Sequence, residues 1–486
     1  MNISLQRKII LIQVILIIIM GFAVYSNSLK GEFIRDDINL VKYNTYIKDW
    51  SKVLNIFMEN AGSGSLARVK SDAYRPLQMF TYMIDYSIWG LNVLGYHITN
   101  TLLHILVALL IYWLIYILYN NRLLSFFTSI IFVVHPANTE VVSYISGRGD
   151  LLSVSFMLLC IIFYIKYLHS ESIGLYLSIL LSSILAILSK ENALILPILL
   201  LLYHYAFKKR IQLKLFLPIL SAILIYILLR ATSLTSFYYG LDALLHRVPG
   251  FFVAIIQYLR ILLFPVNLHM EYGNKIFGFT EPKALFGLLI FLSLLIYAFR
   301  KRNSYKMLFF SVYWFFIALL PTSSIYPVTA FYMAEHWLYL PSIGFFLILA
   351  NGLSLLYKTP RTRFVATGLL VCGLFSYSFL TIRQNNYWRE EIPFYERTLK
   401  YAPFSANVHN DLGSAYLNRG NIEKAIGQFQ KAIENDSNFA IAHFNLAIAY
   451  FQQKKYDLAI KHCDRTIELG NKVDPEFLKL LKPYRK

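Results

Sequence analysis

The sequence predicts an all-α protein built from a polytopic bundle of membrane helices followed by a small α-solenoid. The 486 residues are 57% hydrophobic and 15% charged, whereas a soluble domain is near one-half apolar and one-quarter charged. The apolar excess lies in long runs such as 9–25, 102–119 and 175–188. Such runs approach the length that crosses about 30 Å of hydrocarbon. From residue 383 the chain is instead polar and repetitive, which predicts a membrane domain over 1–382 and a second domain over 383–486.

The first apolar run begins the predicted bundle. It follows Arg7 and Lys8 and has no small-residue cleavage site after it. We therefore interpret it as a retained helix that starts on the cytoplasmic side. Residues 26–96 then form a large outer loop.

Ten further spans are expected, about eleven in all. Their C-terminal ends are predicted near residues 122, 135, 166, 189, 210, 230, 299, 320, 357 and 380. The run 251–264 is apolar but short and contains Gln257 and Arg260. If it crossed, Arg300 to Arg302 would fall outside, against the positive-inside rule. We interpret it as a re-entrant or interfacial helix.

The net charge of +19 follows from the same topology. Lys and Arg gather in the short loops that the rule assigns to the cytoplasm, so a nucleic-acid partner is not needed to explain the charge. The three cysteines, Cys160, Cys372 and Cys463, suggest no disulfide and lack metal-ligand spacing.

The polar segment 383–486 fits the tetratricopeptide repeat, with small and aromatic residues recurring at about 34-residue spacing. The matching positions are Leu412, Gly413, Tyr416, Ala425, Phe429 and Ala432, then Leu446, Ala447, Tyr450 and Ala459. The second helix of a preceding repeat is expected around Tyr395 and Thr398, and residues 474–481 are expected to form a capping helix. The sequence thus predicts about two and a half repeats on the non-cytoplasmic side. Most such repeats bind peptides or proteins, and a purely structural role stays open.

Two adjacent carboxylates, Asp36 and Asp37, follow the first span. Adjacent like charges beside a low-dielectric slab repel, so such a pair is tolerated where it binds a cation, meets bases or transfers protons. The alternative is a hydrated turn at a helix end.

Other ionisable side chains are predicted at the same outer helix ends. They are Arg75, His97, His135, Glu140, Arg148, Asp150, Lys190, Glu191, Glu335 and His336. Arg and Lys suit phosphate, and a nearby carboxylate can act as general base for a hydroxyl. Together they predict a site for an anionic substrate at this face.

Each of these residues also has a structural interpretation. His135 before Pro136 can be a helix stop, Lys190-Glu191 an N-terminal cap, and Glu335-His336 a pin for its loop. Three aromatic residues are typical of an interfacial belt, namely Tyr332, Trp337 and Tyr339.

Six motifs in this order resemble the transmembrane and tetratricopeptide-repeat-containing O-mannosyltransferase family of the glycosyltransferase C superfamily. They are Asp36-Asp37, Tyr74-Arg75-Pro76-Leu77, His135-Pro136-Ala137-Asn138-Thr139-Glu140, Ser146-Gly147-Arg148-Gly149-Asp150 with Ser189-Lys190-Glu191-Asn192, and Ala334-Glu335-His336-Trp337. The resemblance covers nearly the whole chain. It implies a glycosyltransferase C-like fold, a polyprenyl- or dolichyl-phosphate sugar donor, usually of mannose, and a protein Ser/Thr hydroxyl acceptor.

Carried over by position, the resemblance makes Asp36 the catalytic base and Asp37 its support. Arg75, Arg148 and Lys190 would bind the donor phosphate. The site-supporting residues would be His97, His135, Glu140, Asp150, Glu191, Glu335 and His336. Enzymes of this kind invert and often need no metal, so no cofactor is expected, although a divalent cation stays open. The family pattern usually has Arg where this chain has His336.

Two rival functions remain at this point. A non-enzymatic anchor that presents the repeats as an assembly scaffold would explain the tail and the hydropathy, but not the gathering of acids and bases. A lipid transporter would favour ionisable groups near span midpoints, where few occur. The expected partners are a lipid-phosphate sugar, a protein or peptide acceptor, and membrane lipids. The Ile-rich chain favours a bacterial inner membrane over the endoplasmic reticulum.

Overall fold

The computed structural model describes residues 3–65, 73–231, 247–273, 275–322 and 332–485. It divides into two compact units. The first comprises Met1–Leu268 and Asn274–Asn386, and the second comprises His269–Gly273 and Tyr387–Lys486. Within the described ranges the regular elements are all helical, and the one β contact is an isolated bridge between Asn44 and Ser65.

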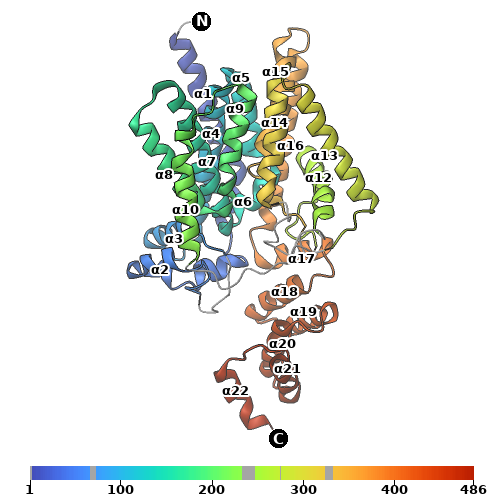
Figure 1. Cartoon of the computed structure of the whole chain (residues 1–486). Coiled ribbons are helices and arrows are strands. Elements are labelled where there is room, and N and C mark those ends of the chain that lie inside the picture. The colour runs from blue at the N-terminus through green and yellow to red at the C-terminus, as the bar shows by residue number, and fades with distance from the viewer. Residues whose placement is uncertain (1–2, 66–72, 232–246, 274, 323–331, 486) are drawn as a thin grey trace. The chain divides into compact units, whose positions relative to one another are not determined.

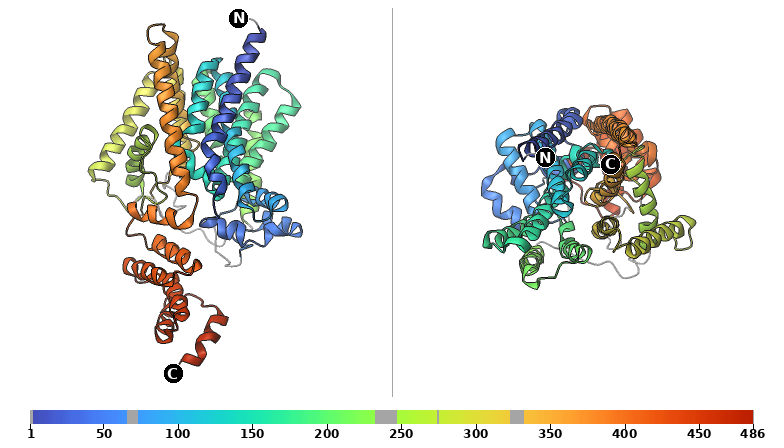
Figure 2. Two further views of the ribbon diagram at one scale, coloured as in Figure 1. Left: turned by 180° about the vertical axis from the view of Figure 1, so that it is seen from behind. Right: turned by 90° about the horizontal axis from the view of Figure 1, so that it is seen from above.

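The first unit is a bundle of apolar helices (Figures 1 and 2). The principal ones are α1 (Ile3–Tyr25), α4 (Val93–Tyr119), α5 (Arg122–Val134), α7 (Arg148–Ser170), α8 (Ile173–Ser189), α9 (Leu196–Phe207), α10 (Leu217–Ala231), α12 (Val248–Leu263), α13 (Pro282–Arg300), α14 (Lys306–Leu319), α15 (Ser342–Lys358) and α16 (Arg363–Tyr387). Helix α7 packs between α4 and α8, and α5 packs against α1, α4 and α15. The core therefore lies among α4, α5 and α7.

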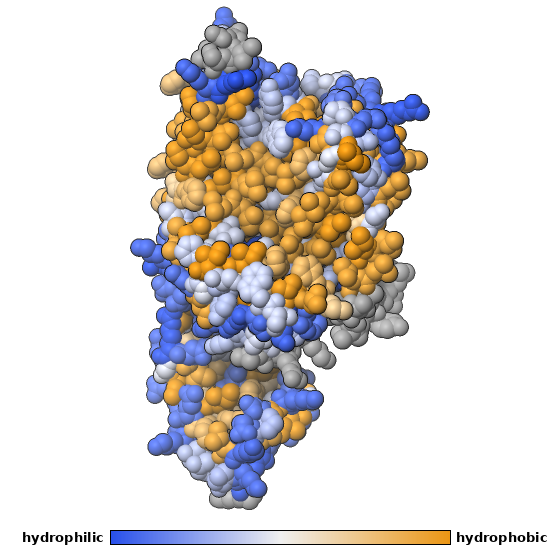
Figure 3. All heavy atoms as spheres, turned by 90° about the vertical axis from the view of Figure 1, so that its left-hand side faces the viewer, coloured by the Kyte–Doolittle hydropathy of each residue, from blue (hydrophilic) through white to orange (hydrophobic). Residues whose placement is uncertain are grey.

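The surface of this unit is apolar where a soluble protein would be polar. Figure 3 shows a broad hydrophobic band on one face, with hydrophilic residues beyond its two edges. On α16 the large side chains point outward, and Phe364 and Phe375 are 89% and 76% exposed. Apolar patches of this extent mark a membrane surface.

Among the residues that the structure describes, six helical stretches are long and apolar enough to cross a bilayer, and six more apolar helices are shorter. The six long stretches are Gln6–Lys30, Val93–Tyr119, Ile145–Ser170, Leu213–Arg230, Pro282–Arg300 and Arg363–Tyr387. The predicted fold class, a polytopic helical bundle followed by helical repeats, is confirmed. The number of spans and the re-entrant assignment of 251–264, which forms most of the 16-residue helix α12, stay predictions.

The segment predicted as an outer loop is a packed structure. It contains short helical turns, α2 (Val53–Met58) and α3 (Pro76–Trp89). Apolar side chains from these elements form one buried cluster with the start of α4 and with Ile145. Its members include Phe33, Val41, Ile47, Ile56, Met79, Tyr82, Met83 and Tyr96. This cluster holds the acid pair and α3 against the bundle.

The second unit is a stack of helical hairpins. Its helices are α17 (Glu391–Tyr401), α18 (Ala406–Asn418), α19 (Ile422–Asn435), α20 (Ala440–Gln452), α21 (Tyr456–Glu468) and α22 (Pro475–Leu481). Small residues allow close helix approach, since a Cβ on Gly413 would lie 2.5 Å from the ring of Phe429. The small side chains of Ala425, Ala432 and Ala447 are buried and likewise allow the helices to approach closely. Helix α22 begins after Asp474, whose side chain accepts from the backbone N–H of Glu476.

Candidate active site

The two adjacent aspartates face different environments. Asp36 is exposed, whereas Asp37 is 1% exposed. The turn that separates them starts at Arg35, whose φ of 51° lies in the left-handed region. Backbone N–H groups of Asp37 and Ile38 donate to the carbonyls of Ile34 and Arg35 at 3.1 Å each. This turn directs one carboxylate outward and the other into the protein.

Asp37 is held by three donors. Its carboxylate accepts from the backbone N–H and the hydroxyl of Ser146, the former at 2.8 Å, and from the backbone N–H of Ile34 at 3.2 Å. Burial raises the pKa of Asp37 to about 7, the hydrogen bonds from Ser146 and Ile34 oppose that rise, and the charge of Asp36 adds to it. Asp37 therefore fixes the loop and binds a proton more readily than an ordinary aspartate.

Asp36 lies beside Tyr144. The backbone N–H of Asp36 donates to the Tyr144 hydroxyl at 3.1 Å. Burial, followed by the charges of Asp36 and Asp37, raises the pKa of Tyr144 well above its ordinary value. The phenol therefore stays protonated beside the two carboxylates.

Helix α3 connects the acid pair to a group of cations. Gln78 donates to the backbone carbonyl of Ser146 and to the hydroxyl of Tyr82, both at 2.9 Å. Arg75 directly precedes Pro76, the first residue of α3, and Gln78 lies in the first turn of that helix. The start of α3 therefore brings the Ser146 segment and Arg75 to one region.

Two ion pairs form the cationic group. Arg75 donates to both oxygens of Glu191 at 2.7 and 3.2 Å, and the two side chains are 23% and 18% exposed. Lys190 donates to both oxygens of Asp150 at 2.8 and 2.7 Å, and both are nearly buried. Because Lys190 and Glu191 are consecutive, the two pairs are neighbours. The partly exposed guanidinium of Arg75 is the cation best placed to meet a ligand.

His336 and Glu140 form a third pair. The backbone N–H and Nδ1 of His336 contact the Glu140 carboxylate at 3.0 and 2.8 Å. Glu335 is 1% exposed. These contacts join the turn Glu335–Leu338 to α6 (Thr139–Ser143), as the loop-pinning interpretation expected, although His336 keeps 29% of its side chain exposed.

His135 has a structural role. It is fully buried, its Nδ1 accepts from the backbone N–H of Ala137, and its Nε2 lies 3.2 Å from the carbonyl of Leu262. This agrees with the helix-stop interpretation. His97 is also buried, and a Cβ on Gly31 would come within 2.7 Å of its Nε2. His97 therefore supports the turn that precedes the acid pair.

Arg148 differs from the expectation. It was predicted as a phosphate ligand, yet its side chain is 0% exposed and its Nη1 pairs with Asp85 at 2.6 Å. Its other nitrogens donate to the Asn100 side chain and the Tyr96 carbonyl at 2.8 and 3.1 Å. Each guanidinium nitrogen contacts a protein partner, and α3, α4 and α7 close around the side chain. We correct its role to that of a buried tie between these helices.

The sequence interpretation missed the partners of these residues. Asp85, Tyr144 and Ser146 each contact a predicted site residue directly. Asp85 could have been found as the lone charged residue of the helix 76–89, since an unpaired charge in a buried helix is expensive. Ser146 belongs to a motif that carries the family resemblance but was given no role, and nothing in the sequence signalled Tyr144. Across the described ranges, no group of three or more His, Cys, Asp or Glu side chains is placed to hold a metal.

Apolar surface, a bundle of long apolar helices and polar pairs gathered at helix ends define a multi-pass membrane protein. Its second unit matches the model of the tetratricopeptide repeat over residues 394–438 and 410–473, which confirms the repeat prediction.

The relatives that the chain resembles are protein O-mannosyl-transferases. It is 27% identical over 448 residues to Protein O-mannosyl-transferase F38B6.6 of Caenorhabditis elegans, covering 87% of this chain and 63% of the relative. It is 26% identical to Protein O-mannosyl-transferase TMTC1 of Homo sapiens, covering 87% of this chain and 55% of the relative. The resemblance to this family is confirmed. The chain therefore spans between about half and two thirds of the length of these relatives.

Two solved structures are similar at lower levels. The oligosaccharyltransferase of Archaeoglobus fulgidus aligns with 12% identity and a TM-score of 0.45, over 77% of this chain and 56% of that one. ArnT from Cupriavidus metallidurans, bound to undecaprenyl phosphate, aligns with 11% identity and a TM-score of 0.41, over 91% of this chain and 78% of that one.

Proposed function

We propose that this chain is an inverting membrane glycosyltransferase that moves a sugar, mannose in the simplest case, from a polyprenyl- or dolichyl-phosphate to a protein Ser/Thr hydroxyl. The observation that carries the proposal is the acid pair, of which one carboxylate is exposed and the other is buried and anchored. The similarity to proteins named O-mannosyl-transferases over most of the chain supports the same reaction class.

In this proposal Asp36 is the general base. Its carboxylate takes the proton of the acceptor hydroxyl as that oxygen attacks the anomeric carbon, and the bond from that carbon to the phosphate oxygen breaks. The phosphate leaves on the lipid. A raised pKa for Asp37 supports this role for Asp36, because a neutral neighbour removes the repulsion that would oppose its ionisation.

We assign neutralisation of the leaving phosphate to this chain's own cations. Arg75 is partly exposed and keeps N–H groups beyond those that meet Glu191. Lys190 lies beside it as a second positive charge, nearly buried with Asp150. Fixed cations aimed at developing charge are a large source of rate enhancement. The reaction is proposed to need no metal, and transfer that persists after chelation with EDTA would support this.

The acceptor side of the proposal concerns the repeats. Helix α16 carries Asn385, whose side-chain oxygen accepts from the Ser143 hydroxyl at 2.9 Å. Ser143 follows Glu140 and precedes Tyr144 in the sequence. The repeats follow this end of α16 in the chain. We propose that the repeats stand on the side of the membrane that holds the site and present the protein acceptor. We further propose a bacterial inner membrane as the location.

A transfer assay tests the reaction. The purified full-length protein is incubated with a panel of polyprenyl- and dolichyl-phosphate sugars and a Ser/Thr peptide, and release of lipid phosphate is measured. Removing the base by Asp36→Asn should lower the rate about 10²- to 10⁴-fold. The matched control is Asp49→Asn, since Asp49 is an exposed acid of the same segment and Asn keeps its cap on Ser51. If none of the lipid-phosphate sugars supports turnover, or if the Asp36→Asn protein is as active as its parent, the proposal is refuted.

A further inference from the structure

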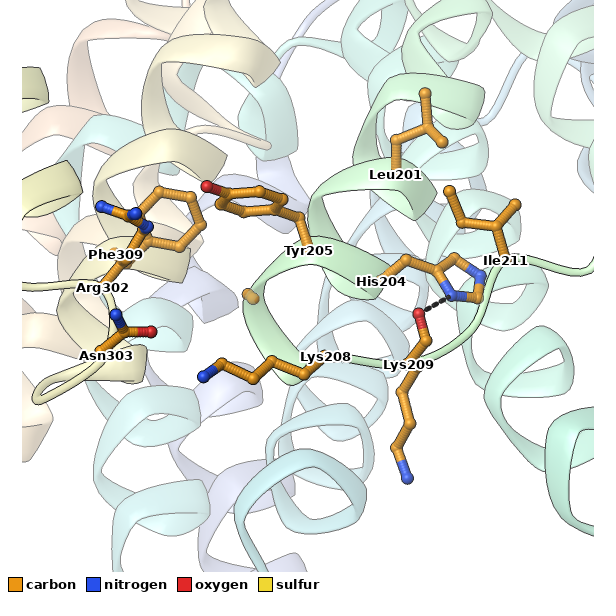
Figure 4. Close-up of a pocket in the computed structure, with 10 residues that line it drawn as sticks. Leu201, His204, Tyr205, Lys208, Lys209, Ile211, Arg302, Asn303 and Phe309 are labelled. Atoms are coloured by element: carbon orange, nitrogen blue, oxygen red, sulfur yellow. Dashed lines mark hydrogen bonds between the residues drawn. The ribbon is translucent and has the colours of Figure 1, made fainter.

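A cavity of about 520 Å³ opens at the basic end of the bundle, which is the end away from the candidate active site. It lies between the last turn of α9 and the connection from α13 to α14 (Figure 4). Its size falls in the range of about 300–1,000 Å³ typical of small-ligand pockets. The transferase site uses none of its residues, which include Leu201, Tyr205, Lys208, Lys209, Arg302 and Phe309.

Positive charge without a carboxylate partner lines one side. Lys208 extends toward the connection that carries Arg302 and Asn303, and Lys209 stands at the rim with its ammonium directed away (Figure 4). Among the described residues, no Asp or Glu forms an ion pair with any of these three cations. Arg302 donates one N–H to the carbonyl of Phe299 at 3.0 Å, which leaves further donors of the guanidinium for a ligand. The lining favours an anion.

The backbone holds Lys208 in an unusual place. Lys208 follows the last residue of α9 with φ 52° and ψ 40°, a left-handed conformation that helix ends usually give to glycine. The backbone N–H groups of Lys208 and Lys209 both return to the carbonyl of His204. A lysine at a position that suits glycine costs backbone energy, and Figure 4 shows that its side chain extends toward the connection from α13 to α14.

The other wall is apolar and open. Leu201 and Tyr205 are 42% and 52% exposed, and the Tyr205 ring packs at 5.4 Å from that of Phe309. Both ring nitrogens of His204 already have protein partners, since Nε2 lies 2.7 Å from the Tyr164 hydroxyl and Nδ1 lies 3.2 Å from the Lys209 carbonyl. A ligand that fits this cavity therefore has an anionic head and an apolar body that continues along the helices.

We propose that this cavity binds one anionic membrane phospholipid, with its phosphate between Lys208 and Arg302 and its acyl chains along Leu201 and Tyr205. Basic pockets between membrane helices recognise such headgroups. Favourable charges at the C-terminus of α9 and the positive-inside pattern account for basic residues in the loop. They do not account for a left-handed lysine that points into an apolar-walled cavity.

The test measures lipid binding to the full-length protein in detergent by native mass spectrometry. The probes are palmitoyl-oleoyl phosphatidylglycerol, the matching phosphatidylcholine, and inorganic phosphate. Phosphatidylglycerol should bind more tightly than phosphatidylcholine, and Lys208→Gly with Arg302→Gln should weaken it about 10- to 30-fold. Lys208→Gly alone should also weaken binding, and because glycine suits the left-handed position this variant keeps the fold.

The matched control is Lys358→Gln with Arg361→Gln, which removes two exposed charges at the end of α15 and in the turn before α16, outside the cavity lining. It should retain parental binding. Equal binding of the two lipids, an equal loss in the control, or unchanged binding in Lys208→Gly would each overturn the proposal. Displacement of the lipid by millimolar inorganic phosphate would show instead a site for the free anion. None of these outcomes depends on transferase activity, so the two proposals fail separately.

Discussion

Asp36 and Asp37 show how one peptide bond can separate two chemical environments. The same side-chain type is exposed at one position and 1% exposed at the next. The sequence marked both as functional because of their adjacency. It contained no information on which one would be buried, since this depends on the turn at Arg35 and on Ser146, 109 residues away.

Asp37→Asn should destabilise the protein by about 1–3 kcal/mol, because an amide NH₂ must replace one accepting oxygen beside the donors of Ile34 or Ser146. Thermal unfolding in detergent measures the change. The exposed control Asp49→Asn should unfold at the parental temperature. An Asp37→Asn protein as stable as its parent would show that these donors find other partners.

The stability of the parent should also depend on pH through Asp37. Its pKa is about 7 in the folded protein and about 3.9 in an unfolded chain. Between these values the folded state holds a proton that the unfolded state has released. The contribution of this group is therefore complete below about pH 4, falls as pH rises to about 7, and is constant above that. Comparing unfolding of the parent and Asp37→Asn at pH 5 and pH 8 should show this loss in the parent alone.

A buried ion pair joins helices α3 and α7 near the candidate site. Arg148 on α7 and Asp85 on α3 meet at 2.6 Å, and Asp85 also accepts from Thr99 on α4 at 2.9 Å. Both charges are removed from water, so each depends on the other. The motif around Arg148 could not distinguish a ligand-facing arginine from a buried one, because the sequence does not show which helices close around the side chain.

Breaking this pair from one side should be costly. Asp85→Asn should destabilise the protein by about 3–5 kcal/mol because it leaves Arg148 buried without its counter-charge. The double variant Asp85→Asn with Arg148→Met should be more stable than Asp85→Asn alone. Unfolding temperatures of the four proteins in the cycle measure the coupling, and strictly additive losses would contradict it.

The segment that carries Tyr144 and Ser146 depends on a close backbone approach at Gly147. A Cβ there would lie 2.4 Å from the backbone oxygen of Val141, which cannot move aside cheaply. Gly147→Ala should displace this segment from Asp36 and Asp37 and lower sugar transfer at least about tenfold, as small misplacements of catalytic groups do. Gly427→Ala on α19 is the control, since its Cβ meets open space. Parental transfer by Gly147→Ala would show that the segment does not position the acids.

At the scale of the whole molecule, the two units allow chemistry and acceptor binding to be tested apart. Phe429 is fully buried in the repeats and contacts Gly413, and Phe429→Ala should cost that unit about 3–5 kcal/mol. If the site lies in the first unit, transfer to a short peptide should persist while transfer to a folded protein acceptor falls. Loss of both would favour the rival scaffold role. Phe375→Ala, at a 76% exposed position on α16, is a control that should leave both activities unchanged.

The sequence by itself determined the two-part helical organisation, the repeat and the motifs that carry the candidate site residues. Hydrophobic run length, repeat spacing and motif order are local properties, and they survive any rearrangement of the helices. The tertiary structure alone decided which charges pair. In the folded chain Arg148 pairs with Asp85, Lys190 pairs with Asp150, and Arg75 pairs with Glu191. Coulomb energy depends on distance and burial, and only the folded chain fixes these for residues far apart in sequence.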